Sequence, residues 1–214
     1  MNAVIVLGGV SPAPGVLRAF ALDAGLIVCA DSGAAAAVEA GIRIDALLGD
    51  MDSISAETLA TVESMGAEIR RFSTEKDEID GQLAVDFCVA RGAKKAFLLG
   101  AGGNRPDHAY ASMMLLYRLE RAGVEAWQVD EGHSLRVTTG KVMLEGWPGR
   151  VVSLLPFGGD AILGNTHGLL YPVEIPKAFS MDQPLGVSNV MITDTAALEI
   201  FSGYVLVVAE NKLG

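Results

Sequence analysis

Two aspartates stand one residue apart directly after a short apolar run, in the segment LLGDMDSI at residues 47–54. Carboxylates this close raise each other's pKa and cost stability unless a cation lies between them. Ser53 and Ser55 are available to cap the helix that follows, so neither Asp50 nor Asp52 is needed as a cap. The pair is therefore either merely solvated or the site of a bound metal ion.

Other charged side chains follow the neighbouring apolar runs in the same way. Each of these residues comes shortly after a predicted strand: Asp31, Asp77, Asp80, Arg105, Asp107 and His108. Taken singly, Asp31, Asp80 and Asp107 are equally well explained as helix caps. Because the carboxyl ends of parallel strands meet at one edge of a sheet, however, we expect these six side chains to lie close together at that edge. Such a carboxylate cluster suits Mg²⁺, which takes one or two carboxylates together with substrate phosphates.

A glycine-rich segment, LGAGGNRPDHA at residues 99–109, leads into a predicted helix. Small residues such as Gly102 and Gly103 let backbone N–H groups approach a phosphate, and the helix would point its positive end at the same place. Arg105 adds a forked cationic donor. Alone, this loop is weak evidence for phosphate binding and is better explained as a tight turn. Together with the acidic strand ends, it fits phosphoryl transfer and favours a Mg²⁺-dependent nucleotide enzyme or nucleotide binder.

The first part of the chain alternates apolar strand-like runs with segments of helical period. Strands are predicted at 3–7, 26–30, 46–48, 68–71, 96–99 and 125–129. Helices are predicted at 16–24, 34–40, 56–65, 82–91 and 109–121. This alternation predicts an α/β N-terminal domain with a mostly parallel, doubly wound sheet over residues 1–130.

After about Asp130 the pattern changes to short strand-like runs separated by Gly, Pro, Asn and Asp. Strands are expected at 134–138, 141–144, 151–155, 161–163, 169–173, 197–201 and 204–209. No helix is predicted among them. The sequence therefore predicts a C-terminal all-β sandwich domain over residues 131–214.

Composition and charge exclude several classes of protein. The chain has 214 residues, a formal net charge of −10 and 50% hydrophobic residues, as expected of a globular protein. The negative charge repels phosphate backbones and anionic lipids, so no nucleic-acid or membrane partner is expected. Cys29 and Cys88 lie far apart in apolar runs, which favours buried thiols in a reducing compartment. With neither a signal peptide nor a membrane segment at the N-terminus, a cytoplasmic protein is expected.

Several segments together resemble the ordered signature of the thiamine pyrophosphokinase family. They are ADSGA at 30–34, IDALLGDMDSI at 44–54, EKDEID at 75–80, LLGAGGNRPDH at 98–108, GLLYPV at 168–173 and VSN at 187–189. The resemblance covers both predicted domains in the family's order. It implies a homodimer that transfers pyrophosphate from ATP to the hydroxyl of thiamine, with thiamine diphosphate and AMP as products.

Carried over position by position, the resemblance implies roles for individual residues. The metal-binding aspartates would be Asp50, Asp52 and Asp80, with Asp31 and Asp77 as supporting acidic groups. The residues of the ATP-binding segments would be Asp31, Ser32, Gly33, Gly102, Gly103, Arg105, Asp107 and His108. Catalysis would rest on Asp50, Asp52, Asp80, Arg105 and Asp107, while Ser188 and Asn189 would face thiamine across the dimer interface.

Two alternatives stay open at this point. Relatives commonly carry threonine where this chain has Ile79, so a non-catalytic nucleotide or thiamine sensor is one alternative. The other is pyrophosphoryl transfer to a different heterocyclic alcohol, such as a pterin, because no tryptophan follows Trp147. An aromatic side chain would stack on the cationic thiazolium ring of thiamine, and Phe201, Tyr204 and Tyr171 are the candidates for that place.

Overall fold

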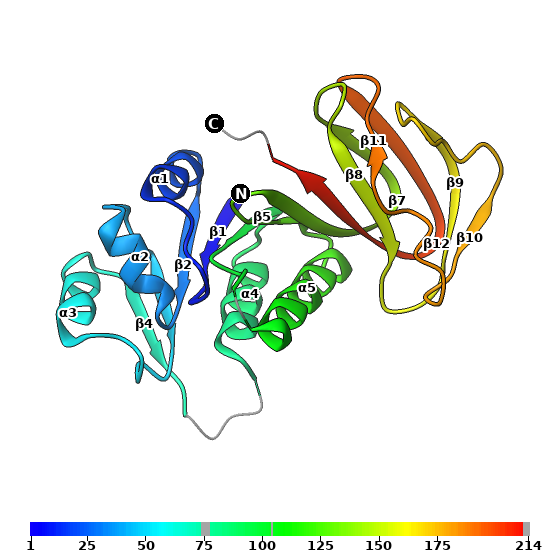
Figure 1. Cartoon of the computed structure of the whole chain (residues 1–214). Coiled ribbons are helices and arrows are strands. Elements are labelled where there is room, and N and C mark those ends of the chain that lie inside the picture. The colour runs from blue at the N-terminus through cyan, green and yellow to red at the C-terminus, as the bar shows by residue number, and fades with distance from the viewer. Residues whose placement is uncertain (74–77, 104, 212–214) are drawn as a thin grey trace. The chain divides into compact units, whose positions relative to one another are not determined.

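The structure, a computed structural model, describes residues 1–73, 78–103 and 105–211. The chain divides into Met1–Asp130 (unit 1) and Glu131–Gly214 (unit 2). Helices and strands alternate in unit 1, whereas the described part of unit 2 consists of strands and their connections (Figure 1). Cys29 and Cys88 are both buried and free. Among the described residues, no helix combines the length and the apolar character needed to cross a bilayer.

Unit 1 contains every strand and helix that the sequence predicts there, with small shifts at the ends. Its strands are β1 (Asn2–Val6), β2 (Leu26–Ala30), β3 (Ala46–Gly49), β4 (Glu68–Arg71), β5 (Lys95–Leu99) and β6 (Glu125–Val129). Its helices are α1 (Pro14–Leu22), α2 (Gly33–Glu39), α3 (Ala56–Ser64), α4 (Asp80–Ala90) and α5 (Pro106–Arg121).

The strands of unit 1 are parallel and run in the order β6-β5-β1-β2-β3-β4. Val4 of β1 pairs with Ile27 of β2 on one side and with Phe97 of β5 on the other. The chain moves outward from β1 to β4 and then returns through α4 to place β5 on the opposite side of β1. Sheets of this kind bind ligands beyond the carboxyl ends of the strands, at the point where the order reverses. The fold therefore marks the ends of β1 and β5 as the place to look for a site.

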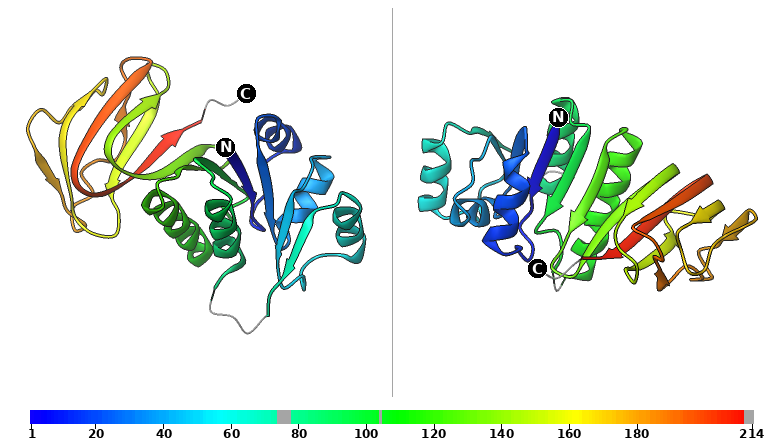
Figure 2. Two further views of the ribbon diagram at one scale, coloured as in Figure 1. Left: turned by 180° about the vertical axis from the view of Figure 1, so that it is seen from behind. Right: turned by 90° about the horizontal axis from the view of Figure 1, so that it is seen from above.

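Helices cover both faces of this sheet. The helices α1, α2 and α3 contact one another in series on one face, while α4 and α5 pack together on the other (Figure 1; Figure 2). Successive strand residues point to opposite faces, so Val4 and Val6 join Leu17 and Ala37 in one core while Ile5 faces α4. Burial on both faces explains why these strands read as continuous apolar runs.

Unit 2 is built around one long strand. Its strands are β7 (His133–Glu145), β8 (Val151–Pro156), β9 (Ala161–His167), β10 (Lys177–Phe179), β11 (Asn189–Val190) and β12 (Thr195–Glu210). β12 pairs antiparallel with β7 along both of its halves. Its first half also pairs with β9 and its second half with β8, on either side of a register shift between Ile200 and Val205. The two halves of β12 therefore have different outer neighbours.

The strand predictions for unit 2 were wrong at three places. The runs 134–138 and 141–144 form one strand, β7, and the runs 197–201 and 204–209 form β12. Gly140 and Gly203, which suggested turns, adopt φ values of 73° and 76° inside these strands, where glycine permits a kink without ending the pairing. The predicted strand at 169–173 is absent, because only Leu169 forms an isolated bridge, to Met191. The short strands β10 and β11 were not predicted.

Candidate active site

The loops that follow β1 and β5 lie side by side at the reversal point of the sheet. The backbone N–H of Gly9 donates a hydrogen bond to the carbonyl oxygen of Gly100 over 2.8 Å. A Cβ atom on Gly9 would lie 2.3 Å from the carbonyl oxygen of Gly102, so a larger residue would push the loops apart. A Cβ atom on Gly33 would likewise lie 2.3 Å from the carbonyl oxygen of Val6. Glycine is thus required where the loops and the start of α2 approach one another.

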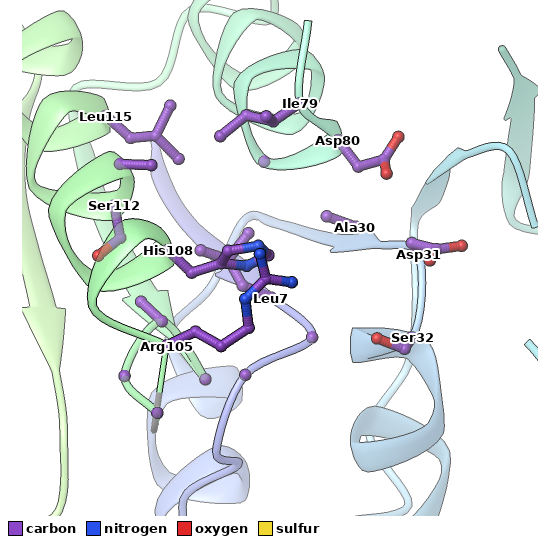
Figure 3. Close-up of a pocket in the computed structure, with 18 of the residues that line it drawn as sticks. Leu7, Ala30, Asp31, Ser32, Ile79, Asp80, Arg105, His108, Ser112 and Leu115 are labelled. Atoms are coloured by element: carbon purple, nitrogen blue, oxygen red, sulfur yellow. The ribbon is translucent and has the colours of Figure 1, made fainter. Parts of the chain in front are cut away.

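A cavity of about 590 Å³ lies beyond these strand ends, between the loops after β1, β2 and β5 and the starts of α4 and α5. Seven of the predicted site residues line it: Asp31, Ser32, Asp80, Gly102, Gly103, Arg105 and His108. Asp31, Ser32 and Asp80 lie on one side, and Arg105 and His108 lie on the other (Figure 3). Acidic and basic side chains therefore face a common space, as binding of a cation together with a polyphosphate requires.

Three carboxylates gather at the adjacent ends of β2 and β3. One oxygen from each of Asp31, Asp50 and Asp52 lies within 4.8 Å of the others. The hydrogen bond between the side chains of Asp52 and Asp50 raises the pKa of Asp52, and the negative charges of Asp50, Asp31 and Asp80 raise it further. These carboxylates repel one another where no cation offsets their charge.

Asp31 has a carboxylate oxygen that the described protein leaves unsatisfied. Its Oδ1 is buried and has no hydrogen-bond partner among the described residues, while its Oδ2 accepts a hydrogen bond from Oγ of Ser53. A buried oxygen without a donor is costly, and a hard cation would satisfy it. Three carboxylates without a nitrogen or sulfur ligand form a donor set that fits Mg²⁺.

Asp31, Asp80 and Asp107 are not the N-cap residues of α2, α4 and α5, so the alternative explanation as helix caps was wrong. The N-cap residues of α2, α4 and α5 are Ser32, Ile79 and Arg105. By contrast, Ser55 caps α3 as predicted, because its Oγ accepts a hydrogen bond from the N–H of Thr58 over 3.1 Å. Asp80 stands in the first turn of α4, where its negative charge lies at the positive end of the helix. Asp77, the remaining predicted metal ligand, lies outside the described residues.

The start of α5 presents the basic side of the cavity. Pro106 occupies the first turn, and Arg105 precedes it as the N-cap, so the positive end of this helix faces the cavity. Nη2 of Arg105 lies 2.7 Å from Oδ2 of Asp107, and both side chains are exposed. The Arg105 guanidinium lowers the pKa of Asp107. Asp107 does not line the cavity itself, so it contacts the site through Arg105.

Three described residues other than glycine adopt left-handed backbone conformations. They are Asp31 (φ 45°), Met51 (φ 68°) and Ser188 (φ 57°). Positive φ is uncommon for such residues, and strain of this kind is found preferentially at functional sites. Asp31 and Ser188 are predicted site residues, and Met51 separates Asp50 from Asp52. All three left-handed residues thus lie in segments that were predicted from the sequence to contain site residues.

Ser188 and Asn189 belong to unit 2, and neither lines the cavity described above. The N–H of Ser188 donates a hydrogen bond to Oγ of Ser153 over 3.0 Å. Asn189 is buried, and its side-chain amide bonds to the main chain of Tyr171 and Val190. The assignment of both residues to thiamine binding stays a prediction.

Several residues of the site were missed from the sequence. Ser112 and Leu115 line the cavity, and their spacing of four and seven residues from His108 places them on the same helical face, which could have identified them. Ser53 was considered only as a cap. Its hydrogen bond to Asp31 depends on β2 and β3 being neighbours, which local sequence does not report.

Comparisons with known proteins point to one family. The family model for the thiamin pyrophosphokinase catalytic domain matches residues 17–127, which is more than half of the chain. A thiamine pyrophosphokinase from Bacillus subtilis (strain 168) is 24% identical over 206 residues, covering 95% of this chain and 96% of that relative.

Solved structures share the fold along the whole chain. Thiamine pyrophosphokinase from Bacillus subtilis has a TM-score of 0.88 at 22% identity and covers 100% of both chains. Thiamin pyrophosphokinase from Geobacillus thermodenitrificans has a TM-score of 0.84 at 24% identity, covering 99% of this chain and 98% of its own. The enzyme from Candida albicans has a TM-score of 0.84 at 19% identity, covering 99% and 89%. These likenesses confirm the mixed α/β fold, and the match to the catalytic-domain model shows that the chain belongs to the thiamin pyrophosphokinase family of enzymes.

Proposed function

We propose that this protein transfers the pyrophosphoryl group of ATP to the hydroxyl of thiamine in a Mg²⁺-dependent reaction that yields thiamine diphosphate and AMP. One observation carries the proposal. The carboxylates of Asp31 and Asp80 and the cationic side chain of Arg105 face one cavity at the point where the order of a parallel sheet reverses. Membership of the family supports this choice of substrates.

The reaction exchanges one phosphorus–oxygen bond for another. The thiamine hydroxyl oxygen bonds to the β-phosphorus of ATP, and the bond from that phosphorus to the oxygen bridging to the α-phosphorus breaks. AMP leaves with the bridging oxygen, and the hydroxyl proton passes to a carboxylate. Asp80 suits this role better than Asp107, because Asp80 lines the cavity and Asp107 is paired with Arg105. Phosphoryl transfer of this kind depends mainly on alignment and charge neutralisation.

Each side of the cavity has its own part in binding. Asp31, Asp50 and Asp52 would hold Mg²⁺, with Asp80 close enough for its charge to affect Asp52. Bound there, Mg²⁺ supplies positive charge that offsets the ATP phosphates. The Arg105 guanidinium and the backbone N–H groups at Ser32, Gly33, Gly102 and Gly103 would bind the remaining phosphate oxygens, with His108 beside them. A β-sandwich in unit 2, with Ser188 and Asn189, would contribute the thiamine side of the site.

A coupled assay for AMP release tests the proposal. Purified protein with Mg²⁺, ATP and thiamine is expected to release AMP and form thiamine diphosphate in equal amounts. ATP binding without AMP release would favour the sensor alternative, which Ile79 at the cavity wall motivates. Release only with a pterin or another heterocyclic alcohol would favour the second alternative.

A homodimer is part of the proposal. Unit 2 exposes many large apolar side chains: Met143, Tyr171, Ile175, Met181, Val187, Ile192 and Phe201. Exposed apolar side chains that adjoin one another are typical of an interface, and the proposed occupant is a second copy of the chain. Sedimentation velocity at micromolar concentration is expected to give a dimer, and a monomer would contradict it. The expected cytoplasmic location stays a prediction.

A further inference from the structure

A buried glutamine of unit 1, Gln128, connects side chains that come from different elements. Gln128, on β6, is 2% exposed, and Ser112, on α5, is 4% exposed. Oε1 of Gln128 accepts a hydrogen bond from Oγ of Ser112 over 2.9 Å. Nε2 of Gln128 donates a hydrogen bond to Oδ2 of Asp130 over 2.7 Å. The side chains of Ser112, Gln128 and Asp130 thus form one hydrogen-bonded network (the Gln128 network).

The direction of these hydrogen bonds follows from the partners of the Gln128 amide. An ionised carboxylate only accepts hydrogen bonds, so the NH₂ group of Gln128 faces Asp130 and its oxygen faces Ser112. The Ser112 hydroxyl also donates to the carbonyl oxygen of Ala109 over 2.8 Å. Figure 3 shows this hydroxyl turned away from the side of the cavity on which Asp80 lies. Ser112 therefore lines the cavity while its proton is used inside the protein.

One end of the Gln128 network lies on the helix that carries the basic side of the cavity. Ser112 follows His108 by four residues and the N-cap Arg105 by seven, so the three residues share one face of α5. This helix packs against β6, and the hydrogen bond from Ser112 to Gln128 joins the two elements. The position of α5 on β6 therefore sets where Arg105 and His108 stand in the cavity.

The other end of the network lies against the glycine-rich loop after β5 (residues 100–103). A Cβ atom on Gly102 would lie 2.9 Å from Oδ1 of Asp130, so this carboxylate occupies the space that a side chain at Gly102 would need. The carbonyl oxygen of Gly102 also accepts a hydrogen bond from the N–H of Val10 over 2.8 Å. Asp130 does not line the cavity, so it supports the loop and does not itself bind a ligand.

A polar network at this place needs an explanation, because its surroundings are apolar. Leu115, Leu116 and Leu119 of α5 are buried, as is Ala126 of β6. An amide in such surroundings loses the hydrogen bonds that it makes with water, and a leucine in place of Gln128 would fill the space without that cost. A satisfied buried network, by contrast, holds its members in one arrangement. Positioning therefore explains the glutamine better than stability alone does.

We infer that Gln128 and Asp130 are positioning residues for phosphate binding, which together fix the start of α5 relative to the glycine-rich loop. They act through the groups that would contact the ligand, namely Arg105 and His108 on the helix side and the backbone N–H groups of the loop. The inference rests on the proposed function, in which these groups bind the phosphates of ATP. Loss of the network is expected to weaken phosphate binding and to leave thiamine binding unchanged.

Calorimetric binding to the full chain in the presence of Mg²⁺ tests the inference with two probes, a non-hydrolysable ATP analogue and tripolyphosphate. Gln128→Leu removes both hydrogen bonds of the amide. It is expected to raise the Kd of both probes by the same factor, about five- to tenfold. In turnover assays the same variant should raise the KM for ATP and leave the KM for thiamine at the wild-type value.

Thr166→Val is the matched control for a general loosening of the protein. Thr166 is buried in unit 2, and its Oγ1 accepts a hydrogen bond from the N–H of Val173 over 2.7 Å. The variant loses a buried side-chain hydrogen bond, as Gln128→Leu does, but far along the chain from the Gln128 network. It is expected to lower the Tm while the Kd values of both probes stay at the wild-type level.

An exchange of the two polar groups tests the network without an apolar replacement. Gln128→Glu alone places two carboxylates against each other and is expected to raise the Kd of the ATP analogue. When Asp130→Asn is added, the new amide can donate to the new carboxylate, which still accepts from Ser112. The double variant is expected to bind the analogue at least about threefold more tightly than Gln128→Glu. Should Gln128→Leu fail to fold, this recovery decides the same question.

Several results would overturn the inference. They are unchanged Kd values in folded Gln128→Leu, a rise for the ATP analogue without one for tripolyphosphate, an equal rise in Thr166→Val, and no recovery in the double variant. Failure of the proposed function gives a different pattern. Protein that shows the expected Kd values but releases no AMP with ATP and thiamine would contradict the function alone. AMP release by the wild type, together with unchanged phosphate binding in Gln128→Leu, would contradict the inference alone.

Discussion

The backbone N–H of Asp52 donates a hydrogen bond to Oδ1 of Asp50 over 3.0 Å. Met51, between them, turns the chain through a left-handed conformation with φ 68°, and its buried side chain belongs to the core formed with α1, α2 and α3. The core therefore fixes a turn that holds two like charges together. Such an arrangement costs stability unless a cation offsets the two negative charges.

Asp50→Asn is expected to abolish most activity while the fold is retained. Asparagine keeps the Oδ1 acceptor for the N–H of Asp52, so the local turn is preserved and only the charge is lost. We expect kcat to fall by about a hundredfold or more. Steady-state AMP release measures the loss, and circular dichroism checks the fold. An unchanged kcat would remove Asp50 from the metal site.

Asp52→Asn is expected to stabilise the metal-free protein at neutral pH. The pKa of Asp52 is raised above its ordinary value of 3.8 in the folded state, first by the hydrogen bond with Asp50 and then by neighbouring negative charges. The folded protein therefore binds this proton more readily than the unfolded chain does. Stability falls as the pH rises from 3.8 through the raised pKa, and the penalty persists above it.

Thermal melts in a chelator check this prediction. At pH 7 the Tm of Asp52→Asn should equal or exceed that of the wild type, and the difference should vanish as the pH falls towards 3.8. Added Mg²⁺ should raise the Tm of the wild type more than that of the variant. A variant that melts below the wild type in the chelator at pH 7 would show that the carboxylates do not repel one another.

Arg105→Lys is expected to weaken ATP binding although it preserves the charge. A guanidinium binds phosphate oxygens with two parallel donors, which an ammonium does not reproduce. We expect the KM for ATP to rise about tenfold. Asp107→Asn should have a smaller effect on KM and little effect on Tm, because the Arg105–Asp107 pair is exposed. Equal kinetics in Arg105→Lys and the wild type would exclude forked recognition of phosphate.

Gly9→Ala and Gly15→Ala form a matched pair that tests the loop contact at the end of β1. A Cβ atom at Gly9 would lie 2.3 Å from the carbonyl oxygen of Gly102, whereas one at Gly15 meets nothing within 4 Å. Gly9→Ala should cost about 1–3 kcal/mol of stability and raise the KM for ATP. Gly15→Ala, within α1, should leave the KM unchanged and raise the Tm slightly. Equal KM values in the two variants would contradict the assignment of this loop to the nucleotide site.

Most of unit 1 could be predicted from the sequence because its signals are local. Buried parallel strands appear as apolar runs such as Leu26–Ala30, and amphipathic helices repeat with helical spacing. The convergence of Asp31, Asp50 and Asp80 also followed, since parallel strands end at one edge. In contrast, the pairing of Ser53 with Asp31 depends on strand order, which no local pattern contains.

Unit 2 was predicted less well, for reasons that concern glycine and hydrogen bonding. Gly140 and Gly203 indicated turns but lie within long bent strands. The apolar run around Leu169 suggested a strand, yet the Asn189 side chain takes the place of a strand neighbour beside Tyr171. A side-chain amide that substitutes for main-chain pairing leaves no periodic signal, so this irregular segment could not be foreseen.

Anomalous scattering from Mn²⁺ in crystals grown with a non-hydrolysable ATP analogue shows whether these aspartates bind a metal ion. We expect a peak within bonding distance of the carboxylates of Asp31, Asp50 and Asp52, in contact with the phosphates, and loss of that peak in Asp50→Asn. Nucleotide bound in the cavity with no Mn²⁺ at these three carboxylates would contradict it.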